Sequence, residues 1–352
     1  MKKILVSTIL CLIALFSNAN NHKTDNAVNY RCEAKRTIEK TFDVGENPIL
    51  EMEGAYSDFT ITAWDKPQID FFVKISVKSD DGKKVEAKFK SIDIVFEQVG
   101  NKIIAKTEFG DYRYKTFNGS ISIKYNVKVP KDVLMDLNTR YGDITLDEAN
   151  KKLKVNIAYG DFKANNINID SLKDNHIYIK YGNANIDATN QCYMELTYSD
   201  AKINKCEYIE AALTYSKIFI TNLNQGMFEN KYSTTRIEQT NSISFAKTVY
   251  SDIKVRNVTN MLSVNMKYSD LNARVTSLAP KIEIDGTYSD AVLYLNENAL
   301  FNHNLKSSYG EISFKNFFDT KSLVRQVNNS DGERGVLNIN VKYGDVKIYK
   351  NK

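Results

Sequence analysis

The chain has 352 residues, of which 42% are hydrophobic and 26% charged, with a formal net charge of +5. This composition can fill a sizeable core, which excludes wholesale disorder and the collagen-like, disulfide-dense and multi-span membrane classes. The charge is too small to indicate nucleic-acid binding, and the length predicts about two domains unless the fold grows by repetition.

The first 19 residues have the pattern of a cleaved secretory signal peptide. Lys2 and Lys3 form a short basic start, Ile4–Phe16 is apolar, and Ser17–Ala19 supplies small residues before the cleavage point. The apolar stretch is shorter than the roughly 20 residues that span a bilayer. We therefore expect an exported chain without a transmembrane segment in its mature part, located in the periplasm, at the cell surface or outer membrane, or secreted.

Residues 20–135 predict an irregular β region whose expected role is to cap the first coil of a repeat, since an open sheet edge recruits other chains. Val85, Phe89 and Ile92 recur at helical spacing and predict one short helical turn over Gly82–Lys90. The strand-like segments are Glu51–Ala63, which has the pattern of one coil, Ile69–Lys78, Ile92–Glu97, Lys102–Glu108 and Ser120–Val129.

From residue 136 onward one motif recurs, a tyrosine followed by Gly or Ser and then usually Asp. Successive motif tyrosines are separated by 17 to 22 residues. They are Tyr141, Tyr159, Tyr181, Tyr198, Tyr215, Tyr232, Tyr250, Tyr268, Tyr288 and Tyr309, with outlying copies at Tyr56 and Tyr343 and a variant at Phe109-Gly110-Asp111. Such a period is the signature of a repeat architecture.

Hydrophobic parity around the motif predicts two strands joined by a bend. Apolar residues lie four and two positions before the tyrosine, as in Val155 and Ile157, and three and five positions after it, as in Ile218 and Ile220. An extra residue at a corner changes the phase of the alternation in this way. The same parity predicts that the tyrosine shares the core-facing side, with stacked rings lining a corner and hydroxyls reaching its edge.

A unit of 17 to 22 residues holds two or three short strands with tight corners, and equivalent strands of neighbouring units then pair in parallel. The sequence therefore predicts an all-β fold, a parallel β-solenoid over residues 136–352 that continues from the N-terminal cap. Residues 316–335 break the period and are predicted to form a loop excursion before a last coil at Tyr343.

Three segments resemble the bacterial "putative adhesin" family of exported β-strand-repeat proteins, a domain of unknown function. The first segment, Ile61–Asp65, ends a strand in Trp-Asp, the second, Tyr125–Pro130, ends in Val-Lys-Val-Pro, and the third, Tyr141–Asp143, begins the repeats. The resemblance runs from about residue 40 onward. It implies an exported envelope protein with a β-solenoid body, and it carries no catalytic residues to this chain.

Motifs of catalytic chemistry are missing from the sequence, including the zinc-protease, nucleophile-elbow, phosphate-loop and Cys-x-x-Cys patterns. The three histidines, His22, His176 and His303, are predicted to lie in polar turns. We therefore expect no catalytic residues, no bound cofactor and no enzymatic activity. A polysaccharide-acting solenoid enzyme and a periplasmic regulatory or envelope-stress module remain as alternatives.

The third motif position forms an acidic stripe in successive coils, namely Asp252, Asp270, Asp290 and Glu311. Like charges about 5 Å apart repel by roughly 0.8 kcal/mol even in water. One interpretation is a Ca²⁺ or glycan site along this stripe. The favoured interpretation is that each acid accepts hydrogen bonds from backbone amides at its own corner, so that no metal is expected.

Cys192 and Cys206 lie 14 residues apart, close enough for neighbouring turns to bring them together as a disulfide, although buried free thiols are the simpler expectation.

The expected function is an adhesin-like scaffold that binds an envelope protein or a cell-surface glycan along one side of the solenoid.

Overall fold

The structure is a computed structural model that describes residues 30–114, 116–315 and 334–351. The predicted signal peptide at 1–19, His22 and most of the predicted excursion at 316–335 lie outside the described residues. The chain divides into two compact units after Asp147. No helix among the described segments is long and apolar enough to cross a membrane.

Unit 1, described from Tyr30 to Asp147, contains eight strands and one helix, and a ninth strand crosses its boundary. These elements are β1 (Cys32–Asp43), β2 (Ile49–Ala55), β3 (Ser57–Trp64), β4 (Gln68–Ser79), α1 (Gly82–Lys90), β5 (Ile92–Val99), β6 (Lys102–Phe109), β7 (Gly119–Pro130), β8 (Leu134–Arg140) and β9 (Ile144–Ala149).

The pairing in unit 1 mixes antiparallel and parallel strands. Strand β4 lies between β1 and β7 and is antiparallel to both. Strand β3 is parallel to β7 and β9, while β2 is parallel to β6 and β8. Buried aromatic and aliphatic side chains fill the space between, with the Phe59 and Tyr125 rings 5.3 Å apart, edge to face.

The helix and the predicted strands of unit 1 are confirmed to within one or two residues at each end. Asp81 caps α1 by accepting hydrogen bonds from the Lys83 and Lys84 amides, and Val85 faces the core. Strand β1 was not predicted from the sequence, because its inward side carries Ala34 and Arg36 among few large apolar residues.

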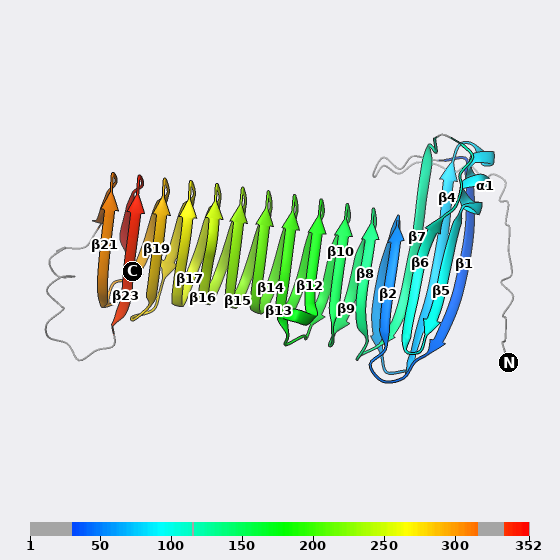
Figure 1. Cartoon of the computed structure of the whole chain (residues 1–352), viewed down its shortest axis with the longest axis horizontal. Coiled ribbons are helices and arrows are strands. Elements are labelled where there is room, and N and C mark those ends of the chain that lie inside the picture. The colour runs from blue at the N-terminus through cyan, green and yellow to red at the C-terminus, as the bar shows by residue number, and fades with distance from the viewer. Residues whose placement is uncertain (1–29, 115, 316–333, 352) are drawn as a thin grey trace, which may run out of the picture. The chain divides into compact units, whose positions relative to one another are not determined.

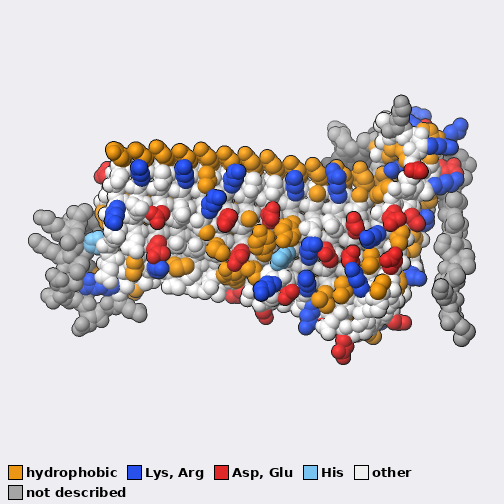
Figure 2. All heavy atoms as spheres, viewed as in Figure 1, with side chains coloured by type: hydrophobic (Ala, Val, Ile, Leu, Met, Phe, Trp, Pro, Cys, Tyr) orange, Lys and Arg blue, Asp and Glu red, His pale blue; other side chains and the backbone are white. Residues whose placement is uncertain are grey.

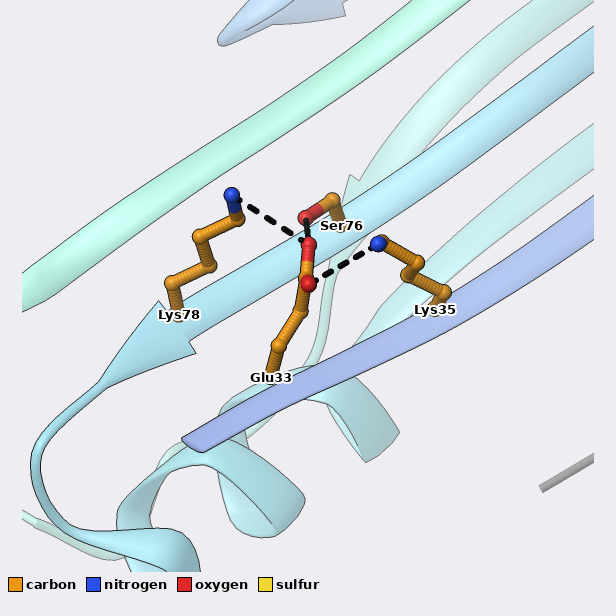
Figure 3. Close-up of polar contacts among 4 residues, drawn as sticks. All are labelled: Glu33, Lys35, Ser76 and Lys78. Carbon is orange, nitrogen blue, oxygen red and sulfur yellow. Dashed lines mark hydrogen bonds and ion pairs between the residues drawn. The ribbon is translucent and has the colours of Figure 1, made fainter. Parts of the chain in front are cut away.

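Polar contacts join the outer side of β1 to β4 (Figure 3). The Glu33 carboxylate lies 2.8 Å from the Lys35 ammonium and 3.4 Å from that of Lys78, and accepts a hydrogen bond from the Ser76 hydroxyl. Burial raises the pKa of Glu33, but the hydrogen bonds from Lys35 and Ser76 and the charge of Lys78 outweigh it, so the pKa is lowered.

Unit 2 consists of strands that follow one another as parallel coils (Figure 1). Its strands are β10 (Leu153–Ala158), β11 (Phe162–Ile167), β12 (Asn175–Lys180), β13 (Asn183–Thr197), β14 (Asp200–Thr214), β15 (Lys217–Lys231), β16 (Thr234–Val249), β17 (Asp252–Lys267), β18 (Asp270–Val275), β19 (Lys281–Thr287), β20 (Asp290–Asn296), β21 (Phe301–Ser308), β22 (Ile312–Lys315), β23 (Gly335–Lys342) and β24 (Val346–Asn351). A short 3₁₀ helix, Leu172–Asp174, precedes β12.

The prediction of an all-β parallel solenoid with an irregular N-terminal β region is confirmed. Equivalent residues of successive coils pair in register, as Ile203 does with Ile220 and Leu213 with Asn230. The residues two and four places before each tyrosine and three and five places after it are largely buried, as the parity predicted. The core of unit 2 is therefore one continuous stack of side chains from consecutive coils.

The coil order at the C-terminal end of unit 2 differs from the sequence order (Figure 1). Strand β23 pairs with β19 on one side and with β21 on the other, and β24 lies in the same way between β20 and β22. The expected last coil at Tyr343 is therefore inserted before the coil at Tyr309. Residues 336–348 supply the fully buried Leu337, Val346 and Ile348, whereas 301–315 is more polar and suits an end position.

Candidate functional site: the tyrosine edge

Every one of the twelve motif tyrosines has a left-handed backbone conformation, with φ between 49° and 60°. Residues other than Gly, Asn and Asp rarely adopt this region, and it costs of order 1–3 kcal/mol. The corner of each coil therefore lies at the tyrosine itself.

Ten of these tyrosines stack face to face in unit 2, and we call them the tyrosine edge. Their ring centroids are 4.7 to 5.1 Å apart and their planes differ by 1° to 11°. In spatial order they are Tyr159, Tyr181, Tyr198, Tyr215, Tyr232, Tyr250, Tyr268, Tyr288, Tyr343 and Tyr309. In unit 1, Tyr56 stacks on Tyr141 at 5.2 Å, and the predicted variant residue Phe109 meets Tyr56 edge-on.

The prediction that the tyrosines share the core-facing side is wrong. Side chains of the tyrosine edge are 38% to 49% exposed, and Tyr309 at its end is 80% exposed. The left-handed conformation turns the tyrosine outward and breaks the alternation one residue earlier than expected. Stacking along the corner, which was also predicted, is confirmed.

Serine residues follow the tyrosines in the middle of unit 2 and occupy the inward position. The Ser233 amide donates a hydrogen bond to the Ser251 hydroxyl, 3.0 Å away, and the Ser251 hydroxyl donates to the Val249 carbonyl. The same pattern links Ser199, Ser216, Ser233, Ser251, Ser269 and Ser289, all of them buried. These corners, which we call serine corners, satisfy their buried polar groups along the solenoid.

Glycine residues replace the serine near both ends of unit 2, and we call these glycine corners. A Cβ atom on Gly344 would lie 2.1 Å from the Ser289 carbonyl oxygen, so close approach of the backbones requires glycine. A Cβ atom on Gly182 would lie 1.8 Å from the Gly160 carbonyl oxygen, and one on Gly310 would lie 2.0 Å from the Gly344 carbonyl oxygen, so the same restriction holds there. None of these three glycines has a positive φ.

The corner type determines what the third motif position bonds to. In the serine corners from Ser199 to Ser269 its amide donates to a backbone carbonyl of the preceding coil, as Asp270 does to Ser251. In glycine corners it donates to a carboxylate instead. The Asn183 amide donates to the Asp161 carboxylate, the Asp345 amide to Asp290 and the Glu311 amide to Asp345, with N···O distances of 2.8 to 2.9 Å. In unit 1 the Asp143 amide donates to the Asp58 carboxylate at 3.1 Å. An aspartate thus precedes each of these glycine corners.

The four predicted residues of the acidic stripe lie in one row of neighbouring coils, and a fifth acid, Asp345, lies between the last two of them. Asp252 pairs with Asp270 and Asp270 with Asp290, while Asp345 lies between Asp290 and Glu311. Burial, followed by the charges of Asp252 and Asp290, raises the pKa of Asp270. No group of three or more His, Cys, Asp or Glu side chains among the described residues is arranged to hold a metal ion.

Lysines precede several tyrosines and flank the tyrosine edge on one side, so that Figure 2 shows a row of basic side chains below the hydrophobic ridge. The Nζ atoms of Lys180, Lys231, Lys267 and Lys342 lie 5.2 to 6.0 Å from the centroids of the following tyrosine rings. These distances place the ammonium groups in cation–π range.

Other residues singled out in the sequence lie away from the tyrosine edge. Cys192 and Cys206 are buried free thiols, and burial raises the pKa of both, that of Cys206 to about 12. The prediction that His176 and His303 lie in turns is wrong, because they belong to strands β12 and β21.

The fold and its corners define a parallel β-solenoid with a stacked tyrosine edge. The chain belongs to the Toastrack DUF4097 family, whose model matches residues 22–349. The family resemblance seen in the sequence is thereby confirmed.

Comparison with solved structures gives distant similarities. A "putative lipid binding protein" from Parabacteroides distasonis is 12% identical, with a TM-score of 0.34 over 90% of this chain and 97% of that one. A "putative adhesin" from Bacteroides fragilis is 11% identical, with a TM-score of 0.30 over 90% and 98%. A "putative cell adhesion protein" from Clostridium sporogenes is 11% identical, with a TM-score of 0.19 over 90% and 100%. A search of the curated proteins gave no match.

Proposed function

We propose that the protein is an exported, non-enzymatic, adhesin-like scaffold that holds a linear anionic polysaccharide of the cell envelope or cell surface along the tyrosine edge. The signal-peptide pattern of residues 1–19 supports export. The observation that carries the proposal is the exposed row of left-handed tyrosines.

Stability alone does not explain tyrosine at this position. Gly, Asn or Asp would adopt the left-handed conformation at less cost than the 1–3 kcal/mol typical of other residues. Stacking of neighbouring rings stabilises the folded state by roughly 0.5–1.5 kcal/mol per pair, which offsets only part of this cost. Repeating the costlier residue in every coil therefore supports a role for the rings at the surface, since backbone strain is concentrated at functional sites.

The geometry of the tyrosine edge favours a linear, repetitive partner. Because the ring faces are covered by neighbouring rings at 4.7 to 5.1 Å, the edge offers ring rims and a row of phenolic hydroxyls. One hydroxyl per coil repeats at the spacing of strands, which is close to the length of one residue in an extended polysaccharide. Phenolic hydroxyls both donate and accept hydrogen bonds, as sugar hydroxyls and carboxylates require.

The charge beside the tyrosine edge favours an anionic polymer over a neutral one. Lys180, Lys231, Lys267 and Lys342 form a broken basic row on one flank. The acidic stripe follows the tyrosines on their other side and repels the same polymer. The bound chain is therefore expected to lie over the lysine flank.

Affinity electrophoresis of the mature chain in gels that contain polygalacturonate, alginate or neutral dextran tests the proposal. Retardation is expected in the acidic gels and not in dextran. The triple variant Lys231→Gln, Lys267→Gln, Lys342→Gln should bind about tenfold more weakly, since three exposed ion pairs of about 0.5 kcal/mol each sum to one factor of ten. The variant Tyr215→Asn, Tyr232→Asn, Tyr250→Asn keeps a residue that tolerates the left-handed conformation and should also lose retardation.

The matched control is Lys202→Gln with Lys254→Gln, which removes exposed lysines from strands β14 and β17 beyond the corners. It should bind more tightly than the triple lysine variant and close to the unchanged protein. Equal binding by the tyrosine variant and the unchanged protein, or no retardation in any acidic gel, would overturn the proposal.

A further inference from the structure

A second cluster of aromatic side chains interrupts the regular surface of unit 2, on the outer side of the strands that lead into the tyrosines. It consists of His176 and Tyr178 on β12, Tyr193 on β13 and Tyr208 on β14, and we call it the side platform. Figure 2 shows hydrophobic side chains gathered beside a histidine on this flank of the solenoid. In the coils that follow, the positions equivalent to Tyr193 are held by Glu210, by the exposed Met227 and then by Ser244 and Ser263.

Strand pairing brings these residues together. His176 pairs with Tyr193, and their ring centroids are 5.5 Å apart. Tyr178 lies 5.9 Å from Tyr193, with the planes inclined by 54°. The His176 Nδ1 and the Tyr178 hydroxyl are within hydrogen-bond distance at 3.1 Å.

The side platform differs from the tyrosine edge in what it offers a partner. Rings of the tyrosine edge cover one another's faces, whereas the rings of His176, Tyr178 and Tyr193 are tilted by 49° to 66° and are not stacked. The four side-platform residues are half-buried, so only part of each ring reaches the surface. An uncovered ring face attracts cations through its quadrupole.

Three glutamates lie on the side of the platform toward the later coils, whereas Lys154 of the preceding coil pairs with His176 on the other side. Glu195 pairs with Tyr178, Glu210 pairs with Tyr193, and Glu229 lies one coil further on. Among the described residues, none of the three forms an ion pair with a lysine or arginine. The Tyr208 hydroxyl donates to the Glu210 carboxylate at 3.0 Å.

The effect of these charges is visible at Tyr193. Burial is the largest cause that raises the pKa of Tyr193, and the charge of Glu195, the neighbouring Tyr178 and the charges of Glu229 and Glu210 raise it further. The negative field at this hydroxyl thus adds to the negative potential of the ring faces.

We propose that the side platform is a docking surface for a partner protein that presents arginine side chains. A guanidinium group stacks on aromatic faces and binds carboxylates with two parallel hydrogen bonds, so it matches tilted tyrosines beside glutamates. Tyrosine and arginine are also enriched at the centres of protein interfaces. The charge requirement is opposite to that of the tyrosine edge, so the two surfaces select different partners.

Titration of the mature chain with three synthetic peptides tests the proposal. The peptides share one sequence that alternates glycine with arginine, lysine or uncharged citrulline, and binding is followed by calorimetry. The arginine peptide should bind about three- to tenfold more tightly than the lysine peptide, and the citrulline peptide should not bind detectably. Equal affinities for arginine and lysine would overturn the role of the rings.

Two sets of variants separate a built surface from general charge attraction. Glu195→Gln, Glu210→Gln, Glu229→Gln and the single change Tyr193→Thr should each weaken the arginine peptide at least threefold, with thermal unfolding unchanged within a few degrees. The control Asp252→Asn, Asp270→Asn, Asp290→Asn removes the same charge from the acidic stripe and should leave binding intact. Equal weakening by the control would overturn the proposal. None of these variants touches the lysine flank, so failure here leaves the polysaccharide test unaffected.

Discussion

The middle of unit 2 and its two ends have different residues and hydrogen bonds at the corner that follows each tyrosine. From Tyr198 to Tyr288 the tyrosine is followed by a buried serine, whose hydroxyl accepts a hydrogen bond from the amide at the same position of the preceding coil, Gly182 for Ser199 and a serine for the others. At Tyr181, Tyr309 and Tyr343 it is followed by glycine, and backbones approach too closely for a Cβ atom. The exposed tyrosine is the same in both regions, so the difference lies beneath it.

This difference explains which acids the corners require. A carboxylate is needed where the next corner in space contains glycine, because the amide there donates to it, as Asp345 does to Asp290. Asn183, Lys217 and Thr234 interrupt the aspartates, and each is followed by a serine corner, in which the amide bonds to a backbone carbonyl. The interruptions therefore fall where the carboxylate has no structural task.

The largest expected effect comes from breaking the register of the middle region. Deleting Tyr215–Lys231 removes one whole 17-residue coil and joins two serine corners, so a folded and shorter unit 2 is expected. Deleting only Lys217–Asn224 should unfold unit 2, because the remaining corner no longer meets its neighbours. Circular dichroism and thermal unfolding of both proteins distinguish the outcomes, and equal stability would contradict the solenoid description.

Much of this fold could be predicted from the sequence because spacing and parity survive in each coil. The repeat period predicted the parallel coils, and the helical spacing of Val85, Phe89 and Ile92 predicted α1 with its bounds. The outward direction of the tyrosines was missed because parity assumes an unbroken strand, whereas a left-handed residue resets it. The inward position is taken instead by the small residue that follows each tyrosine.

The position of the last coil was missed for a different reason. Sequence order predicts stacking order only when each connection is short, and residues 316–333 separate β22 from β23. The strong alternation of Leu337, Ile339 and Val341, compared with the polar run at 302–304, could have indicated that the later coil is the interior one.

The next largest effect is expected at the glycine corners. Gly344→Ala places a Cβ atom 2.1 Å from the Ser289 carbonyl oxygen, so the backbones must separate. A loss of roughly 3 kcal/mol or more in the free energy of unfolding is expected. Urea unfolding measures it. In the control Gly226→Ala, the nearest atoms are side-chain carbons 3.0 Å away that can move, so the loss should be clearly smaller.

A smaller effect is expected in a serine corner. Ser251→Ala removes the acceptor of the buried Ser233 amide, and an unsatisfied buried donor costs about 1–3 kcal/mol. Ser263→Ala, on the outer side of β17, changes the same atoms outside the corner and should be nearly neutral. Equal losses in the two variants would show that the serine hydrogen bonds contribute little to the middle region.

The smallest effect is expected for the acidic stripe. The variant Asp252→Asn, Asp270→Asn, Asp290→Asn keeps the side-chain oxygen that accepts the Asp345 amide and removes the repulsion between neighbouring carboxylates. It should be neutral or slightly stabilising at pH 7. Because the pKa of Asp270 is raised, the unchanged protein gains stability relative to the variant as the pH falls through that value. Thermal unfolding between pH 7 and pH 3 should therefore show the two curves converging.

Calcium separates this account of the acidic stripe from a cation site. If the aspartates serve only their corners and the glycine corner that follows, millimolar Ca²⁺ should leave the melting temperature of both proteins unchanged. A site filled at 100 times its dissociation constant would add about 2.7 kcal/mol to the free energy of unfolding, and the asparagine variant would lose that increment. Such a calcium-dependent rise, absent from the variant, would show that the acidic stripe has a task that the corner geometry does not require.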